Sequence, residues 1–255
     1  MRVGRIKQSL TFWPVSRLAQ SNPDFARQVA AIGFVAIEMA PEQYWPAIRE
    51  AGLAIPIVGG HGTLSDGLNR RENHDRIERE LRANIRKAAE NGIPSLIVFS
   101  GNRRGLSDDE GVEICAEGIR RVIRQAEEEG VTLCMELLNS KVDHPDYQCD
   151  HTEWGVKVCE AVGSPRFKLL YDIYHMQIME GDLIRTIKKY IRYIGHFHTA
   201  GNPGRHNLDE NQEIYYPAVM RAIAESGYDG YVGHEFGPVG DPMAALRQAY
   251  EACNV

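Results

Sequence analysis

Four short apolar runs in the second half of the chain each carry one side chain that binds metal ions well. Each run is rich in β-branched or aromatic residues and too short for a helix, which predicts a buried parallel strand with the functional group near its C-terminal end. Three carboxylates and one imidazole would be costly to bury together unless a cation were bound among them. The mixed oxygen and nitrogen set suits one divalent ion: Mn, Mg, Co or Zn. The side chains are Glu136 in VTLCMELLN, Asp172 in KLLYDIYHM, His198 in YIGHFHTAG and Glu235 in YVGHEFGP.

A single acid at a strand end is more often a helix cap or an ion-pair partner than a ligand. Here a metal-binding side chain lies near the end of each of four consecutive strand-like runs, and neighbouring strands stand only about 5 Å apart. This repetition favours a metal site over four unrelated caps.

Four further residues are candidate substrate contacts. His175 follows Asp172 by three residues, and Arg205 lies in the loop GNPGRHN, where its guanidinium suits forked recognition of a carboxylate. His61 in GGHG and Glu38 in FVAIEMA end two earlier strands and are expected at the same mouth.

The neighbouring histidines are expected to support the site rather than form it. His196 precedes His198 by two residues, so in a strand it shares the same face one layer deeper, as a buried, hydrogen-bonded support. His234 is adjacent to Glu235, so it points to the opposite face and is expected to pack against helices. Trp13 ends the first strand, where it either walls the mouth or belongs to the core.

Eight strand-like runs alternate with amphipathic helical stretches along the chain. Several helical stretches end in Gly directly before the next strand, as a left-handed C-cap requires; these are Gly33, Gly52, Gly92 and Gly130. The strand-like runs cover residues 5–13, 34–40, 53–62, 93–101, 131–139, 168–176, 193–201 and 231–238, and the helical stretches cover 24–33, 42–52, 74–92, 111–130, 153–163, 182–193, 216–227 and 243–253.

This alternation predicts a parallel sheet with right-handed crossovers. Eight units in about 250 residues match a closed (β/α)8 barrel, a TIM barrel, with the active site at the C-terminal ends of its strands. We therefore expect one α/β domain over residues 1–255. An open doubly wound sheet is the alternative, disfavoured because no GxGxxG or GxxxxGK[ST] loop follows an early strand.

Composition limits the classes of partner. The net charge of −6 gives no electrostatic footprint for nucleic acid or an anionic membrane, which favours a small soluble substrate. The start MRVGRIKQSLTFW has no apolar segment followed by a cleavage site, so a cytoplasmic location is expected. Five cysteines without a CxxC pair are expected to be reduced thiols, mostly buried; Cys149, in a polar loop, is left open.

On these residues the chain resembles the xylose isomerase-like barrel superfamily of sugar isomerases and epimerases, and within it the hydroxypyruvate isomerase group. The resemblance covers essentially the whole chain and is most specific in MELLN, YDIYHMQIMEGDL, YIGHFHTAGNPGRHNLDENQEIYYP and GYDGYVGHEFGP. It implies that Glu136, Asp172, His198 and Glu235 are the metal ligands, that Glu136 and Glu235 are also the acid/base pair, and that His175 and Arg205 contact substrate. A homo-oligomer is a further expectation from the resemblance.

The implied chemistry passes through an enediolate. A cation that chelates a carbonyl and its adjacent hydroxyl acidifies the neighbouring C–H. If one carboxylate moves the proton between adjacent carbons, the product is an isomer; if the second carboxylate returns it to the opposite face, the product is an epimer. An isomerase of a small hydroxy-carbonyl acid or sugar is thus predicted, with a ketose 3-epimerase as alternative. His198 bears on this choice, because the ketose 3-epimerases have His at this position whereas the hydroxypyruvate isomerase pattern can have Gln.

Two other classes of function fit the barrel less well. An endonuclease IV-like phosphodiesterase needs further His and Asp ligands, but strand four ends FSGN and no Asp-x-His pair follows His198. A non-catalytic sugar-binding barrel is disfavoured because the four-ligand set is intact.

Overall fold

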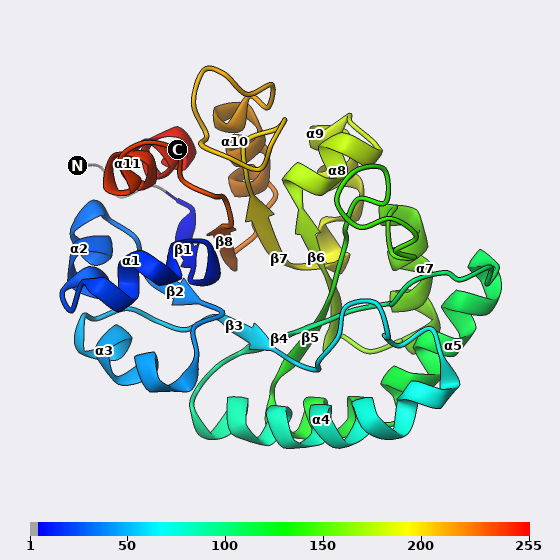
Figure 1. Cartoon of the computed structure of the whole chain (residues 1–255). Coiled ribbons are helices and arrows are strands. Elements are labelled where there is room, and N and C mark those ends of the chain that lie inside the picture. The colour runs from blue at the N-terminus through cyan, green and yellow to red at the C-terminus, as the bar shows by residue number, and fades with distance from the viewer. Residues whose placement is uncertain (1–4) are drawn as a thin grey trace. The chain divides into compact units, whose positions relative to one another are not determined.

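The apolar runs form eight parallel strands in the computed structural model, which describes residues 5–255 (Figure 1). Each strand is followed by one or more helices, so the predicted alternation is confirmed. Among the described residues no helix is both long enough and apolar enough to span a membrane. The strands are β1 (Lys7–Thr11), β2 (Ala36–Glu38), β3 (Ile57–Gly59), β4 (Ser95–Val98), β5 (Thr132–Glu136), β6 (Phe167–Asp172), β7 (Ile194–Thr199) and β8 (Tyr231–His234).

The helices carry apolar faces that pack toward the strands. The four predicted C-cap glycines all have positive φ angles, for example 72° at Gly130, so these predictions are confirmed. The α-helices are α1 (Ser16–Ser21), α2 (Phe25–Ile32), α3 (Trp45–Glu50), α4 (Arg71–Glu90), α5 (Asp108–Arg120), α6 (Ile123–Glu129), α7 (Thr152–Val162), α8 (Ile173–Met179), α9 (Leu183–Tyr190), α10 (Tyr216–Glu225) and α11 (Pro242–Cys253), and the 3-10 helices are η1 (Trp13–Val15), η2 (Glu42–Tyr44) and η3 (Ile191–Tyr193).

The chain forms two compact units. Among the described residues, unit 1 contains 5–56, Asp182–Ile191 and His196–Val255, and unit 2 contains Ile57–Gly181 and Arg192–Gly195. The prediction of one domain over residues 1–255 therefore stays a prediction.

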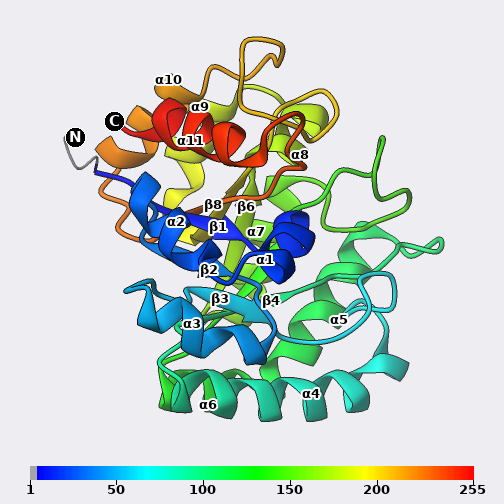
Figure 2. The ribbon, with the colours of Figure 1, turned by 60° about the vertical axis from the view of Figure 1, so that its left-hand side comes forward.

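In unit 1 the strand order is β2-β1-β8-β7, and neighbouring strands pair in parallel. Gly233 of β8 pairs with Ser9 of β1 on one side and with His198 of β7 on the other. Helix α11 packs against α2 and α10, and α10 packs against α9 (Figure 2). This register places Ser9, Gly233 and His198 in one row across the sheet.

In unit 2 the strand order is β6-β5-β4-β3, again in parallel. Glu136 at the end of β5 pairs with Leu170 of β6, two residues before Asp172. Because side chains alternate along a strand, Glu136 and Asp172 belong to the same face. Helix α4 packs against α5 and α6, and α5 packs against α7 (Figure 2).

The structure corrects the predicted elements in two places. Residues 168–176 were expected to form one strand, but β6 ends at Asp172 and α8 follows at once, because Asp172 caps this helix by accepting from the His175 amide at 3.1 Å. The single helix expected over residues 111–130 is two, α5 and α6. Between them the amides of Arg121 and Val122 bond only three residues back, which tightens the turn and ends α5.

Candidate functional site

In unit 1 a chain of ionisable groups runs from Glu38 through His198 to Glu235. Glu38 is the last residue of β2, and its Oε1 lies 2.8 Å from His198 Nε2. Glu235 follows β8 directly, and its Oε2 lies 3.1 Å from His198 Nδ1. Both nitrogens of one imidazole are therefore next to a carboxylate.

The carboxylate of Glu38 is completely enclosed, with 0% of the residue exposed. It accepts hydrogen bonds from Ser9 Oγ and from Thr11 Oγ1, the latter at 3.1 Å, and its Oε2 lies 3.1 Å from His196 Nε2. Burial alone disfavours the charged carboxylate, but His196 and His198 outweigh it and hold the pKa of Glu38 well below its usual range. Glu38 is therefore ionised inside the sheet.

Glu235 is held by two donors from loops of unit 1. Trp13 Nε1 donates to its Oε1 at 2.5 Å, and Arg205 Nη2 donates to its Oε2 at 2.5 Å. The Arg205 guanidinium also lies 5.5 Å from the centre of the Trp13 ring, a cation–π distance. Although burial disfavours its charge, His198 and Arg205 lower the pKa of Glu235 far below that of a free glutamate.

In unit 2 Glu136 and Asp172 end neighbouring strands and are almost fully buried. His175, in the first turn of α8, has no exposed surface, and its Nε2 lies 3.7 Å from Asp172 Oδ2. Its Nδ1 lies 2.6 Å from Asn139 Nδ2. Asn139 also donates to Asp143 Oδ2 at 2.7 Å, so the loop after β5 holds the His175 ring in place.

Two of the other predicted residues are His61 and His196. His61 is buried, with Nδ1 2.9 Å from the Gly62 carbonyl and Nε2 accepting the Phe99 amide at 3.0 Å; burial lowers its pKa. Its contact with substrate stays a prediction. His196 is a buried partner of Glu38, as expected.

His234 packs away from Glu235, as predicted. Its ring nitrogens lie 2.8 Å from Thr199 Oγ1 and 2.9 Å from Gln8 Oε1, and the ring meets Phe34 edge-on. Burial lowers the pKa of His234 to about 4, so the ring is neutral at ordinary pH.

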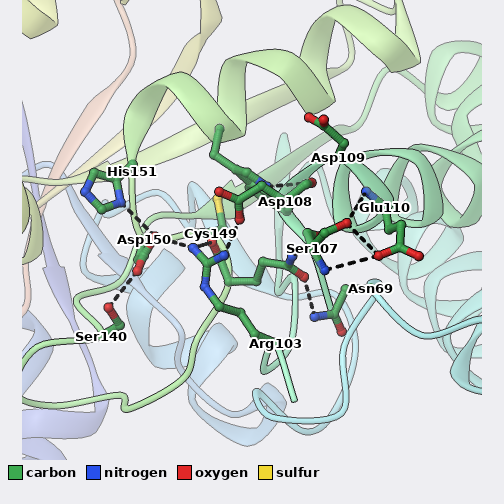
Figure 3. A network of polar contacts seen from close by, with 12 residues as sticks. Asn69, Arg103, Ser107, Asp108, Asp109, Glu110, Ser140, Cys149, Asp150 and His151 are labelled. Carbon is green, nitrogen blue, oxygen red and sulfur yellow. Dashed lines mark hydrogen bonds and ion pairs between the residues drawn. The ribbon is translucent and has the colours of Figure 1, made fainter. Parts of the chain in front are cut away.

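A polar network in unit 2 ties the loop after β4 to the loop after β5 (Figure 3). Arg103 donates to Asp150 Oδ1 at 3.0 Å and also pairs with Asp108. Asp150 accepts from Ser140 Oγ at 2.6 Å and lies 2.8 Å from His151 Nδ1. Asp150 therefore orders the segment that follows Glu136.

All five cysteines are free and buried, as expected for reduced thiols. Cys149, which the sequence left open, has no exposed surface, and burial raises its pKa well above that of a free thiol. Such a thiol is a small hydrophobic side chain rather than a nucleophile.

One group that the sequence did not reveal is the Trp13 indole as a donor to Glu235. The two residues are 222 positions apart, and only the pairing of β1 with β8 brings their loops together. The sequence signal for this contact was the position of Trp13 at the end of the first predicted strand.

The donor atoms of unit 1 fit a divalent cation. Two neighbouring ligands that each lie about 2.0–2.2 Å from an octahedral ion are about 3 Å apart. The 3.1 Å between His198 Nδ1 and Glu235 Oε2 matches this spacing. One imidazole nitrogen and one ionised carboxylate are also the ligand types that Mn and Zn accept.

Comparison with known proteins gives a consistent family. Residues 25–253 match the family model described as xylose isomerase-like TIM barrel. The chain is similar to a human protein named provisionally as a hydroxypyruvate isomerase, at 28% identity over 240 residues, covering 88% of this chain and 87% of that protein. Hydroxypyruvate isomerase of Escherichia coli is 34% identical over 143 residues, 56% of this chain and 55% of the relative.

Two solved structures share the fold. The AP endonuclease, family 2, from Brucella melitensis has a TM-score of 0.81 at 23% identity, over 94% of this chain and 97% of that chain. An L-ribulose 3-epimerase has a TM-score of 0.79 at 18% identity, over 96% of this chain and 92% of the other. With the family match, these likenesses confirm the predicted TIM-barrel fold class.

Proposed function

Because the chain belongs to the xylose isomerase-like TIM barrel family, we propose that it is a metal-dependent isomerase of a small hydroxy-carbonyl acid or sugar. The observation that carries the proposal is the buried pair of His198 Nδ1 and Glu235 Oε2, 3.1 Å apart. An imidazole nitrogen and an ionised carboxylate at ligand spacing need a shared proton or a shared cation. The four-residue pattern of the sequence favours the cation.

We propose that this cation is one divalent ion, Mn, Mg, Co or Zn, bound by Glu136, Asp172, His198 and Glu235. Glu136 and Asp172 end β5 and β6, and His198 and Glu235 lie at the ends of β7 and β8. In a TIM barrel the C-terminal ends of consecutive strands surround one active-site mouth. When bound, the ion polarises the carbonyl and hydroxyl oxygens of the substrate and stabilises the charge that develops on them.

The residues of the chain would then move the proton. Glu235 is held ionised by His198 and Arg205, so it is ready to accept a proton from the carbon next to a carbonyl. Glu136 is the second member of the pair. Transfer of the proton between adjacent carbons gives the isomer, and its return by the other carboxylate to the opposite face gives the epimer.

For the substrate we propose a keto acid such as hydroxypyruvate, converted to tartronate semialdehyde. Arg205 supports this choice, because its fork of N–H groups suits a carboxylate and it lies beside Glu235. His175 is the second proposed substrate contact, through its position beside Asp172. The names of the relatives in human and E. coli agree with this substrate class. Cytoplasmic location and a homo-oligomer stay predictions.

The decisive experiment is solvent deuterium exchange. With Mn²⁺ present, the protein should exchange the α-proton of hydroxypyruvate or of a ketose, and metal removal by EDTA should stop the exchange. The Glu235→Gln variant should lose the exchange while its circular dichroism stays unchanged. Absence of exchange across a panel of keto acids and ketoses, with metal bound, would refute the proposal.

A ketose 3-epimerase is the second candidate. The observation that favours it is His198, because the epimerase pattern has His at this position whereas the hydroxypyruvate isomerase pattern also has Gln there. The fold likeness to an L-ribulose 3-epimerase is consistent with it. Product analysis by NMR separates the two activities: the epimerase inverts C3 of a ketose, and the isomerase moves the carbonyl.

A further inference from the structure

Glu38 is a buried carboxylate whose partners all belong to unit 1. The sequence places it among the substrate contacts, but 0% of the residue is exposed and His198 is one of its hydrogen-bond partners. We propose that Glu38 is a positioning residue that fixes the proton of His198 on Nε2 and leaves the Nδ1 lone pair for the cation. This inference rests on the function proposed above.

The direction of the hydrogen bonds decides the tautomer. Both oxygens of Glu38 act as acceptors, because Oε2 accepts from the hydroxyl of Ser9 and Oε1 accepts from the hydroxyl of Thr11. His198 Nε2, at 2.8 Å from Glu38 Oε1, must therefore carry a proton. A neutral imidazole with its proton on Nε2 has its lone pair on Nδ1, the atom that faces Glu235. Metal-binding histidines commonly donate their other N–H to a carboxylate in this way.

Gly233 makes the room for this carboxylate. A Cβ atom at Gly233 would lie 2.3 Å from Glu38 Oε1 and 2.7 Å from its Cδ. Gly233 pairs with Ser9 and with His198, so the missing side chain leaves a gap between two of the donors that Glu38 bonds. The carboxylate of Glu38 fills this gap. Glycine is required here for space, because any side chain at position 233 would overlap the carboxylate of Glu38.

A second cation is the competing explanation of the cluster. Glu38, His196 and His198 each offer one ligand atom within 4.8 Å of the others. However, each oxygen of Glu38 already accepts from a hydroxyl group, Oε2 from Ser9 and Oε1 from Thr11, and His198 Nε2 lies 2.8 Å from Oε1. These contacts favour protons between the groups, and the metal stoichiometry tests the alternative.

The first experiment measures Mn²⁺ affinity of the full chain by isothermal titration calorimetry. Glu38→Gln and Gly233→Ala should each weaken binding about 10- to 100-fold, as the loss of such outer partners does. In the Glu38→Ala background, Gly233→Ala should have little further effect, because the space is then free. Asp150→Asn removes another buried carboxylate, in unit 2, and is the control, with unchanged affinity.

The second experiment needs no metal. Long-range ¹H–¹⁵N spectra of the metal-free protein, with His198 assigned by comparison with His198→Gln, should show a proton on Nε2. An unprotonated Nε2 overturns the inference. Because this spectrum is recorded on the unaltered chain, it decides the matter even where Glu38→Gln fails to fold.

The outcomes separate this role from the proposed function. If the unaltered protein binds no Mn²⁺, both the proposed function and the role of Glu38 are wrong. If it binds Mn²⁺ and both Glu38→Gln and Gly233→Ala bind it equally well, only the role of Glu38 is wrong. Binding of two Mn²⁺ ions, reduced to one by Glu38→Gln, would assign Glu38 as a ligand and overturn the positioning role.

Discussion

The indole of Trp13 gives Glu235 a fixed orientation, and this can be tested by removing one N–H group. Trp13→Phe keeps an aromatic ring under Arg205 but loses the 2.5 Å hydrogen bond to Glu235 Oε1. A hydrogen bond to a charged group contributes about 1.5–3 kcal/mol, so we expect kcat/KM for α-proton exchange to fall about 10- to 100-fold. Trp45→Phe is the control, since Trp45 donates only to the Ala40 carbonyl. Equal rates in the two variants would contradict this role.

Arg205 tests the choice between an acid and a neutral sugar as substrate. Arg205→Lys keeps the charge beside Glu235 but loses the forked geometry that binds a carboxylate with two parallel hydrogen bonds. We expect KM for hydroxypyruvate to rise at least about tenfold, whereas KM for a neutral ketose should change little. Both are measured by solvent exchange at saturating Mn²⁺. A matching rise for the two substrates would remove the reason to prefer an acid.

The sequence reveals individual ligands better than the contacts that support them. Glu136, Asp172, His198 and Glu235 are recognisable because each interrupts an apolar run at the end of a strand. The contact of Glu38 with His198 joins residues 160 positions apart, and only the strand register brings them together. A hydrogen bond of this kind has no local signature, so the sequence placed Glu38 at the site without its partner.

At the scale of elements, the network around Asp150 makes stability depend on pH. Asp150 has a lowered pKa, because His151, Ser140 and Arg103 outweigh the effect of burial, and His151 has a raised pKa through Asp150. The contribution of Asp150 is complete above its unfolded pKa of about 3.9 and is lost as pH falls through its folded pKa. The contribution of His151 is complete below its unfolded pKa of about 6.5 and is lost as pH rises through its folded pKa.

Asp150→Asn should therefore destabilise the protein most near about pH 5–6, between these two transitions, by about 1.5–3 kcal/mol. The difference in unfolding free energy from the unaltered chain should shrink on both sides, as measured by urea unfolding across the pH range. Asp108→Asn removes the exposed partner of the same Arg103 and should cost less than about 1 kcal/mol. A pH-independent difference for Asp150→Asn would show that this coupling does not affect folding.

The hydrophobic periodicity of the sequence predicted the order of the elements but not the residues at which they end. Every predicted strand overlaps an observed one, yet the run 168–176 continues as α8 after Asp172. The residues IYHM are apolar enough for a strand, but the Asp172 carboxylate accepts a hydrogen bond from the His175 amide and so stabilises the start of a helix. The same residue is a proposed metal ligand, so one side chain ends a strand, starts a helix and faces the site.

At the scale of the whole molecule, the proposed cation takes its ligands from four strand ends, those at Glu136, Asp172, His198 and Glu235. An ion that binds the folded chain and not the unfolded chain stabilises it by mass action, by about 2.7 kcal/mol at a hundredfold excess over Kd. For a chain of this size we expect Tm to rise by about 5–10 °C when Mn²⁺ replaces EDTA. Differential scanning calorimetry of both forms measures this shift, together with the Glu136→Gln and Glu235→Gln variants.

Each of these variants removes one proposed ligand, so both should lose most of the Mn²⁺-dependent rise in Tm. Asp150→Asn lowers Tm in both conditions but should keep the difference between them, because Asp150 touches none of the four ligands in its own network. If Glu235→Gln loses the rise and Glu136→Gln keeps it, Glu136 is not a ligand of the cation, and the four-ligand site proposed from the sequence is wrong.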